Sequence, residues 1–288
     1  MTEEMLRLYN DMVYERHKIY LARLNGLPQP WTEDPVLTNL KMTNMFRVLD
    51  PGSQFVFELD DDDPLNVIAR LVFYRLTNLP ATWHGLKSQF GHFPTADDFV
   101  HRQALLFNFL NTYRNEGNRV FSGAYIIVPE PGTANDKVGG ALRVVRHFIQ
   151  EKAEAYFTAA TQDERFNVLR SVPGLGPFLS MQILTDWTYL QPEEPDLSFV
   201  VAGPGAQRGA RLLNPTMKAE DVIYDLAVDW SDVSSVQLAG RSLTPMDVQN
   251  TLCEFSKYAR ELLSPRKKSA YRPAHPGRQH TPIVPHWW

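Results

Sequence analysis

The stretch of sequence that decides the fold is Asp163–Trp187, which reads DERFNVLRSVPGLGPFLSMQILTDW. Its first part has the pattern of a short helix that ends near Val172. A second helix is predicted to begin at Pro177, because proline is favoured at the first helical position. Between them, Pro-Gly-Leu-Gly makes a tight turn that only glycine-rich sequence tolerates. The stretch therefore predicts two helices joined by a hairpin, over about residues 164–190.

A turn of this composition between two helices resembles the helix-hairpin-helix motif. Glycines let backbone N–H groups approach a DNA phosphate, and the following helix adds the positive end of its dipole. Such contacts bind DNA without reading its sequence. We therefore expect DNA binding by Pro173, Gly174, Leu175 and Gly176. The alternative is a corner between two helices that needs glycine only for its backbone conformation.

Apolar residues recur at helical spacings in the rest of the chain as well. They predict helices over residues 3–24, 64–78, 95–116 and 138–157, and a C-terminal helix that opens at Thr244. Residues 119–132, RVFSGAYIIVPEPG, are expected to form a short strand or an extended segment. The predicted fold class is mainly α: a helix-hairpin-helix, DNA-glycosylase-like helical fold with little strand.

We expect residues 1–263 to form a single domain of two helical lobes, followed by an extended basic and aromatic tail at 264–288. The 288 residues are 43% hydrophobic, which suffices for a sizeable core. No apolar run is long enough to cross a membrane, so a cytoplasmic protein without membrane association is expected. The formal net charge is −4. DNA binding must therefore depend on local basic patches, such as Lys267 and Lys268, unless the tail is merely solvated.

The cysteine and histidine content limits the metal chemistry. Cys253 is the only cysteine, which excludes an internal disulfide, an all-cysteine zinc site and a four-cysteine iron–sulfur cluster. The eight histidines form no HExxH motif and no tight pair. We expect no metal and no cofactor.

Residues 199–213, FVVAGPGAQRGARLL, are predicted to form a glycine-rich loop. They do not match the dinucleotide fingerprint, because Arg208 stands where its third glycine belongs, and no GK[ST] follows as in a Walker loop. Exposed N–H groups at Gly203 and Gly205, together with the guanidinium groups of Arg208 and Arg211, suit a phosphate or pyrophosphate. The alternative is a structural loop with surface arginines.

Polar side chains at core-facing positions need either a partner or a function. Gln182 and Asp186 share a face of the second hairpin helix with apolar residues, by their i, i+4 spacing. Asp186 is therefore either a catalytic group or a capping or salt-bridging residue. In the C-terminal helix, Glu254 and Lys257 lie away from the predicted apolar stripe and can pair at i, i+3. That stripe comprises Val248, Leu252, Phe255, Ala259 and Leu262.

Six blocks of sequence, taken in order, resemble a known family. They are ERHKIYLARLNGLPQPWTEDPVL, TNMFRVLD, VFSGAYI, VPGLGPFLSMQILTD, VVAGPGAQRG and DVQNTLCEFSKYAR. From about Glu15 to Tyr258 the chain is similar to the alpha-glutamyl/putrescinyl-thymine pyrophosphorylase family, also described as amino acid:DNA transferases. The resemblance implies a glycosylase-like fold without glycosylase activity, in a phage enzyme of thymine hypermodification.

The resemblance also implies the reaction. An amine, either an amino acid or a polyamine, displaces pyrophosphate from 5-(pyrophosphoryloxymethyl)uracil in double-stranded DNA. Departure of pyrophosphate needs positive charge, for which Arg47, Arg208 and Arg211 are the candidates. The incoming amine must be neutral, so a carboxylate base is required, and the candidates are Asp50 and Asp186.

The modified base must also leave the DNA stack to be reached. Tyr125 and Phe46 are the candidates for holding it, and Gln182, Glu254 and Lys257 are further polar candidates for the pocket. Each has a plainer interpretation. Arg47 and Asp50 stand at i, i+3 and can pair with each other, and Tyr125 can simply pack.

Two other functions remain open. Base-excision enzymes with this hairpin often carry a nucleophilic lysine just after it, where this chain has Pro177 and Phe178. That difference counts against a bifunctional lyase but leaves a monofunctional DNA base glycosylase possible. A non-catalytic helix-hairpin-helix protein that only binds DNA is the third alternative.

Overall fold

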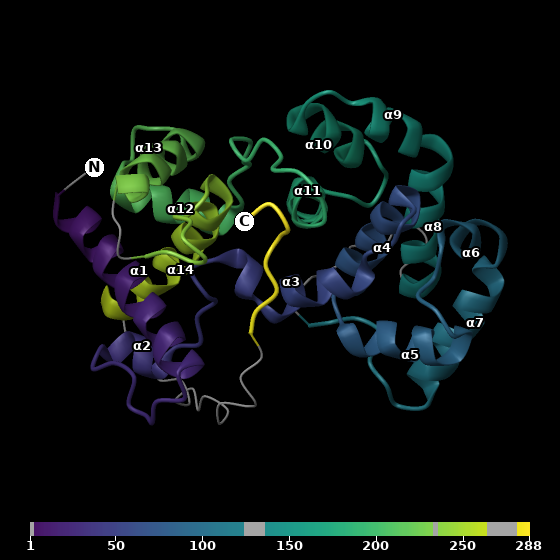
Figure 1. Cartoon of the computed structure of the whole chain (residues 1–288), viewed down its shortest axis with the longest axis horizontal. Helices are drawn as coiled ribbons and strands as arrows, with labels where there is room; N and C mark the ends of the chain where they lie inside the picture. The colour runs from purple at the N-terminus through teal and green to yellow at the C-terminus, as the bar shows by residue number, and fades with distance from the viewer. Residues whose placement is uncertain (1–2, 124–135, 233–235, 264–280) are drawn as a thin grey trace. The chain divides into compact units, whose positions relative to one another are not determined.

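A computed structural model describes residues 3–123, 136–232, 236–263 and 281–288 of the chain (Figure 1). The described residues are mainly α, as predicted. Among them, β pairing is confined to an isolated antiparallel bridge between Leu238 and Arg241. They divide into two compact units. Unit 1 takes in residues 1–50, 197–284 and 288, and unit 2 takes in residues 51–196 and 285–287.

Unit 1 joins the two ends of the chain. Its helices are α1 (Glu3–Leu24), α2 (Pro35–Asn39), the 3-10 helix η1 (Arg47–Leu49), α12 (Pro204–Leu213), α13 (Ala219–Asp232) and α14 (Pro245–Leu263). The helix expected at residues 3–24 is confirmed, and so is the one that opens at Thr244. The closest helix pair of the unit is α12 and α14, which Figure 1 shows side by side.

The glycine-rich segment at 199–213 is not the loop that we expected, because most of it is helix α12. Its glycines serve the contact with α14. A Cβ atom at Gly205 would stand 2.2 Å from the Sγ of Cys253, and one at Gly209 would stand 2.1 Å from the carbonyl oxygen of Leu252. Both distances are far below van der Waals contact, so only glycine allows the helices to approach this closely. Backbone packing thus explains a pattern that also resembles a phosphate loop.

Unit 2 contains the central part of the chain. Its elements are α3 (Pro51–Val56), η2 (Phe57–Leu59), α4 (Pro64–Thr77), α5 (Pro80–Phe90), α6 (Ala96–His101), α7 (Gln103–Asn115), α8 (Lys137–Glu151), α9 (Ala153–Thr158), α10 (Gln162–Arg170) and α11 (Pro177–Tyr189). Helix α4 is buried from Val67 to Thr77 and packs against both α8 and α11. It begins at Pro64 with Asp63 as N-cap, as its sequence predicts.

Two long helices expected from the sequence are each divided in two. The segment 95–116 breaks at Arg102, between α6 and α7, and the segment 138–157 breaks at Lys152, between α8 and α9. Both residues leave the helical region of backbone conformation, with φ/ψ of −116°/22° and −128°/−20°. The strand expected at 119–132 falls mostly outside the described residues.

The hairpin has the predicted arrangement of helix, glycine turn and helix. Helix α10 opens with a capping box between Thr161 and Glu164. Gly174 has a positive φ of 93°, and Gly176 is the N-cap of α11. Gly174 and Gly176 are both exposed. None of the helices within the described stretches combines the length and apolarity needed to cross a bilayer.

Candidate functional site

Unit 1 contains a group of polar side chains in its interior, which we name the buried charge cluster. Its members are Arg16, Asn44, Arg47, Asp50, Asp247 and Glu254. They come from α1, from the segment that leads into η1, and from α14. Arg16, Arg47, Asp247 and Glu254 each retain 6% or less of their exposure. Charged groups this deeply buried are costly unless they are paired, so they mark a candidate site.

Hydrogen bonds link α1 to the segment before η1. The Nη2 of Arg16 donates to the Oδ1 of Asn44 at 2.7 Å and to the carbonyl oxygen of Met42 at 3.2 Å. The backbone N–H of Asn44 donates to the Oδ1 of Asp50 at 3.3 Å. Asn44 therefore connects the guanidinium of Arg16 to the carboxylate of Asp50.

The first turn of α14 fixes the position of Arg47. Asp247 accepts hydrogen bonds from Thr244, its partner in the predicted N-terminal cap, and its Oδ1 accepts from the backbone N–H of Arg47 at 2.7 Å. Burial raises the pKa of Asp247 above its usual value, and these hydrogen bonds oppose the shift. A local helix cap thus also holds η1 in place.

Asp50 is the most unusual carboxyl group of the cluster. Burial raises its pKa from 3.8 to about 6, against the opposing effect of Arg47, while the negative charge of Glu254 adds to the increase. The pairing of Arg47 with Asp50 that the sequence suggested is thus present as an electrostatic interaction. A carboxyl group with a pKa near 6 can accept and release protons close to neutral pH, which suits a general base.

Glu254 and Lys257 of α14 pair as predicted, but Glu254 is more deeply buried than expected for a position away from the apolar stripe. They form the expected i, i+3 ion pair, with 2.5 Å between Nζ and Oε1. However, Glu254 is buried at 2% exposure and accepts from the backbone N–H of Thr43 at 3.4 Å. The expected apolar stripe of α14 was wrong at its end, because Leu262 is 41% exposed. Tyr258, one helical turn before Leu262, is buried instead.

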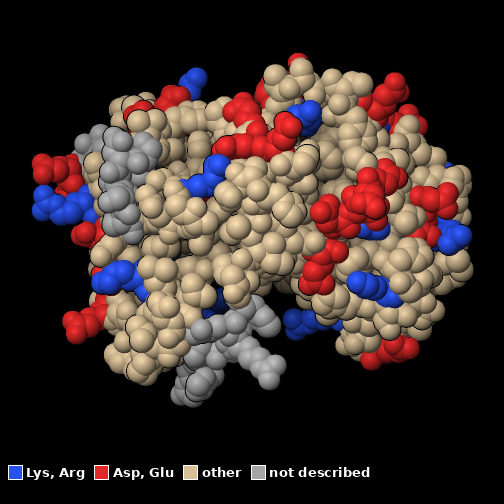
Figure 2. All heavy atoms as spheres, in the orientation of Figure 1, with Lys and Arg blue, Asp and Glu red and all other residues tan. Residues whose placement is uncertain are grey.

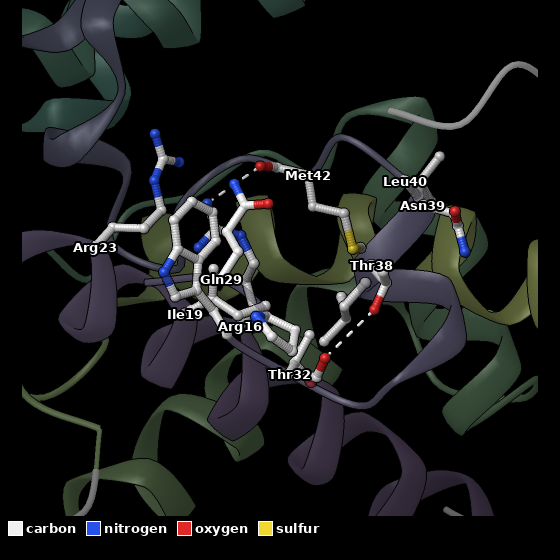
Figure 3. Close-up of a pocket in the computed structure, with 12 residues that line it drawn as sticks. Arg16, Ile19, Arg23, Gln29, Thr32, Thr38, Asn39, Leu40 and Met42 are labelled. Carbon is white, nitrogen blue, oxygen red and sulfur yellow. Dashed lines mark hydrogen bonds between the residues drawn. The ribbon is translucent and has the colours of Figure 1, made fainter. Parts of the chain in front are cut away.

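A cavity of about 640 Å³ lies in unit 1 between α1, the segment at 29–32 and α2 (Figure 3). We name it the arginine–tryptophan pocket. It is lined by Arg16, Ile19, Arg23, Gln29, Pro30, Trp31, Thr32, Leu37, Thr38, Asn39, Leu40 and Met42. Arg16 and Met42 belong to its wall and also take part in the hydrogen bonds beside Asn44. The pocket therefore shares Arg16 with the buried charge cluster.

Four residues of the cluster and the pocket were not predicted as site residues from the sequence: Arg16, Arg23, Trp31 and Asn44. A signal was present for Arg16, which follows Val13 by three positions and so falls on the buried face of the predicted first helix. All four residues also lie within the two most N-terminal of the six quoted blocks, ERHKIYLARLNGLPQPWTEDPVL and TNMFRVLD.

Asp186 lies in unit 2 and is not part of the cluster. It is fully buried and forms an ion pair with Arg75 of α4. This is the salt-bridging role that the sequence left open beside the catalytic one, and the catalytic role stays a prediction. Gln182, also buried, lies on the same helix α11. Tyr125, Lys267 and Lys268 lie outside the described residues.

The residues expected to bind pyrophosphate differ in how far they are exposed to solvent. Gly203 is the N-cap of α12, whereas Gly205 is covered by Cys253. Arg208 and Arg211 lie on the exposed side of α12. The charge of Arg208 acts on the thiol of Cys253, whose pKa is raised overall by burial.

The distribution of surface charge bears on the DNA binding that the sequence predicts. In Figure 2, acidic and basic side chains are interspersed over the visible face, and acidic groups are prominent. The formal net charge of −4 has the same sign. A surface of this kind exerts little long-range attraction on DNA phosphates.

Comparisons with known proteins identify relatives of the chain. It is 24% identical over 228 residues to a "5-hmdU DNA kinase" of Bacillus phage SP10, which covers 70% of this chain and 35% of that protein. The chain thus matches about a third of the length of this curated relative. No solved structure matches.

The family described as "5-hmdU DNA kinase, helical domain" matches residues 3–268. The resemblance to pyrophosphorylases is thus confirmed only at a coarser level, that of a phage thymine-modification family. With nearly its whole length matched, the chain belongs to the family of 5-hmdU DNA kinase helical domains.

Proposed function

We propose that this chain acts on phage DNA that carries derivatives of 5-hydroxymethyluracil, and that it replaces pyrophosphate with an amine. The substrate is 5-(pyrophosphoryloxymethyl)uracil in double-stranded DNA. Membership of the helical-domain family supports the modified base as the target. The observation that carries the reaction is Asp50, a partly buried carboxyl group whose pKa is raised to about 6 beside two buried arginines.

The atoms of the reaction balance as follows. The lone pair of the amine nitrogen attacks the exocyclic carbon of the base, and the bond from that carbon to oxygen breaks. Pyrophosphate leaves with the electron pair, and the proton of the ammonium group passes to the carboxylate of Asp50. Arg47 supplies positive charge where negative charge develops on the leaving pyrophosphate, and a low-dielectric interior strengthens that effect.

Phosphoryl transfer is the second candidate, because the curated relative is named a kinase. The 288 residues contain no GK[ST] sequence, which the Walker phosphate loop requires. The relative is also much longer than the matched segment. We therefore assign the amine step, and not the phosphorylation, to this chain.

Mass spectrometry of nucleosides separates the two candidates. The protein is incubated with DNA that carries either 5-hydroxymethyluracil or its pyrophosphorylated form, in the presence of ATP and a mixture of amines. The proposal predicts that only the pyrophosphorylated base changes, with loss of pyrophosphate and gain of an amine. A phosphate added to 5-hydroxymethyluracil would instead show a kinase, and release of a free base would show a glycosylase.

A further inference from the structure

The arginine–tryptophan pocket has an uneven distribution of charge. Among the described residues that line it, Arg16 and Arg23 carry charge and no aspartate or glutamate is present. The acceptors of Arg16 at Met42 and Asn44 are neutral oxygens. A pocket with this lining favours a ligand that carries negative charge.

Arg23 is held in position by the aromatic ring of the pocket. Its guanidinium carbon lies 5.3 Å from the centroid of the Trp31 ring, in a cation–π contact. The indole Nε1 of Trp31 donates in turn to the carbonyl oxygen of Leu27 at 2.8 Å. Figure 3 shows Arg16, Arg23 and Gln29 among the residues that line the pocket. The cationic wall is thus oriented before any ligand arrives.

The neighbouring cavity of about 440 Å³ provides a contrast. It shares Pro30, Trp31 and Thr32 with the first pocket, and its other lining residues are Glu15, Lys18, Glu33 and Asp34. Its acidic groups are largely engaged within the protein. Glu15 pairs with Lys18 at 2.7 Å. Asp34 caps α2 and accepts from the hydroxyl of Tyr258 at 2.6 Å. This cavity therefore offers few acceptors to a polyamine.

We propose that the arginine–tryptophan pocket binds the carboxylate of an α-amino acid, which is the amine donor. This inference rests on the proposed function, and it selects an amino acid over a polyamine. The carboxylate is bound by Arg16 and Arg23. The amine is carried on the adjacent carbon of the ligand. Arg16 is hydrogen-bonded to Asn44, whose backbone N–H donates to Asp50. Asn44 thus links the proposed carboxylate site to the proposed base by hydrogen bonds.

The apolar part of the pocket predicts which amino acids bind best. Ile19, Leu37 and Met42 are buried residues of its wall. They favour an aliphatic side chain, since each buried methylene contributes favourably. L-leucine should therefore bind more tightly than glycine. A polyamine has no carboxylate for the arginines and would place ammonium groups against them.

Direct binding in the absence of DNA tests this inference independently of catalysis. Isothermal titration calorimetry is carried out with L-leucine, glycine, putrescine and dTMP, on the parent chain and on Arg23→Gln. Lys18→Gln is the matched control, because Lys18 is a cation of the same helix that lines the neighbouring cavity instead. We expect L-leucine to bind the parent and the control equally. Arg23→Gln should raise its Kd about tenfold to a hundredfold, as loss of a charge-assisted contact predicts.

The outcomes separate this inference from the proposed function. L-leucine binding that depends on Arg23, without any transfer to DNA, would support the pocket and refute the reaction. Transfer to DNA from putrescine, without binding of L-leucine, would leave the reaction standing and overturn the pocket. Tighter binding of dTMP than of L-leucine would show a nucleotide site and would also overturn it.

Discussion

The guanidinium of Arg75 and the carboxylate of Asp186 form a two-point ion pair in the interior of unit 2. Nη2 donates to Oδ1 at 2.6 Å, and Nε donates to Oδ2. The two side chains are 3% and 0% exposed. Arg75 also donates to the Oδ1 of Asn78 at 3.1 Å, at the end of helix α4. This geometry joins α4 to α11 and explains why a carboxylate stands on the core-facing side of the second hairpin helix.

Asp186→Asn should therefore destabilise unit 2. The change leaves the charge of Arg75 buried without its counter-charge, which typically costs about 3–5 kcal/mol. Urea denaturation measures the loss. Asp97→Asn is the control, because Asp97 is 66% exposed and its replacement should change stability by less than about 0.5 kcal/mol. A fully stable Asp186→Asn protein without transfer activity would restore Asp186 as the base.

Asp50→Asn should instead stabilise the protein at neutral pH. Burial raises the folded-state pKa of Asp50 from 3.8 to about 6, so between these values the folded state holds a proton that the unfolded state releases. Stability thus falls as pH rises through this range and stays lower above it. Removing the ionisation should raise the free energy of unfolding at pH 7.5 by up to about 3 kcal/mol.

Denaturation at pH 3.5 and pH 7.5 checks the sign of this effect. At pH 3.5 the carboxyl group is mostly protonated in both states, so parent and Asp50→Asn should differ little. An equal or lower stability of the variant at pH 7.5 would contradict the raised pKa. Stabilisation together with loss of activity is the pattern expected of a functional residue.

Gly209→Ala should disrupt the contact between α12 and α14. The added Cβ would lie 2.1 Å from a backbone oxygen, that of Leu252, which cannot move without displacing the helix. We expect a loss of about 1–3 kcal/mol or more. Gly140→Ala is the matched control, because the nearest atom to its Cβ is the Nη2 of Arg143 at 3.8 Å. There alanine should stabilise α8 by about 0.5–1 kcal/mol. Thermal denaturation of the two variants gives the comparison.

DNA binding by the hairpin is best tested at Gly176. Gly174 has a positive φ, and a Cβ there would stand 2.8 Å from Val144, so its variants test folding as well as binding. Gly176 has no heavy atom within 4 Å of the Cβ position. Gly176→Glu should keep the fold and weaken duplex binding about tenfold or more, because a carboxylate would face a phosphate.

Gln89→Glu provides the control for charge in that experiment. Gln89 is exposed on α5, outside the hairpin, and the substitution adds the same negative charge. Binding is measured by fluorescence anisotropy at one fixed salt concentration, since affinity for DNA depends on salt. Equal affinities of the two variants and the parent would contradict hairpin docking.

Much of the helical structure was predictable from local sequence signals. The N-cap of α4 at Asp63 and the turn at Gly174 are set by neighbouring residues, so the sequence alone locates them. The break at Arg102 was not predictable, because the polar and apolar spacing continues across it. The packing of Gly205 against Cys253 was not predictable either, since whether a glycine faces a ligand or another helix depends on tertiary packing.

The candidate site was predictable in part. Asp50, Arg47 and Glu254 were identified as polar candidates, and the structure brings them together from segments about 200 residues apart. Arg16 and Asn44 were missed because their importance depends on contacts with each other. The sequence alone could not separate the two roles of Asp186, because a buried carboxylate has the same pattern in sequence whether it pairs with an arginine or accepts a proton.

The central claim is that Asp50 accepts the proton when an amine displaces pyrophosphate. It is tested most directly with 15N-labelled amines, by mass spectrometry of nucleosides from DNA that carries 5-(pyrophosphoryloxymethyl)uracil. We predict that the parent chain and Asp97→Asn transfer the label to the base. Asp50→Asn, although folded, should transfer it about a hundredfold or more slowly at pH 7.5, as loss of a general base predicts. Labelled product formed by Asp50→Asn at the parent rate, or none formed by the parent, would contradict the account.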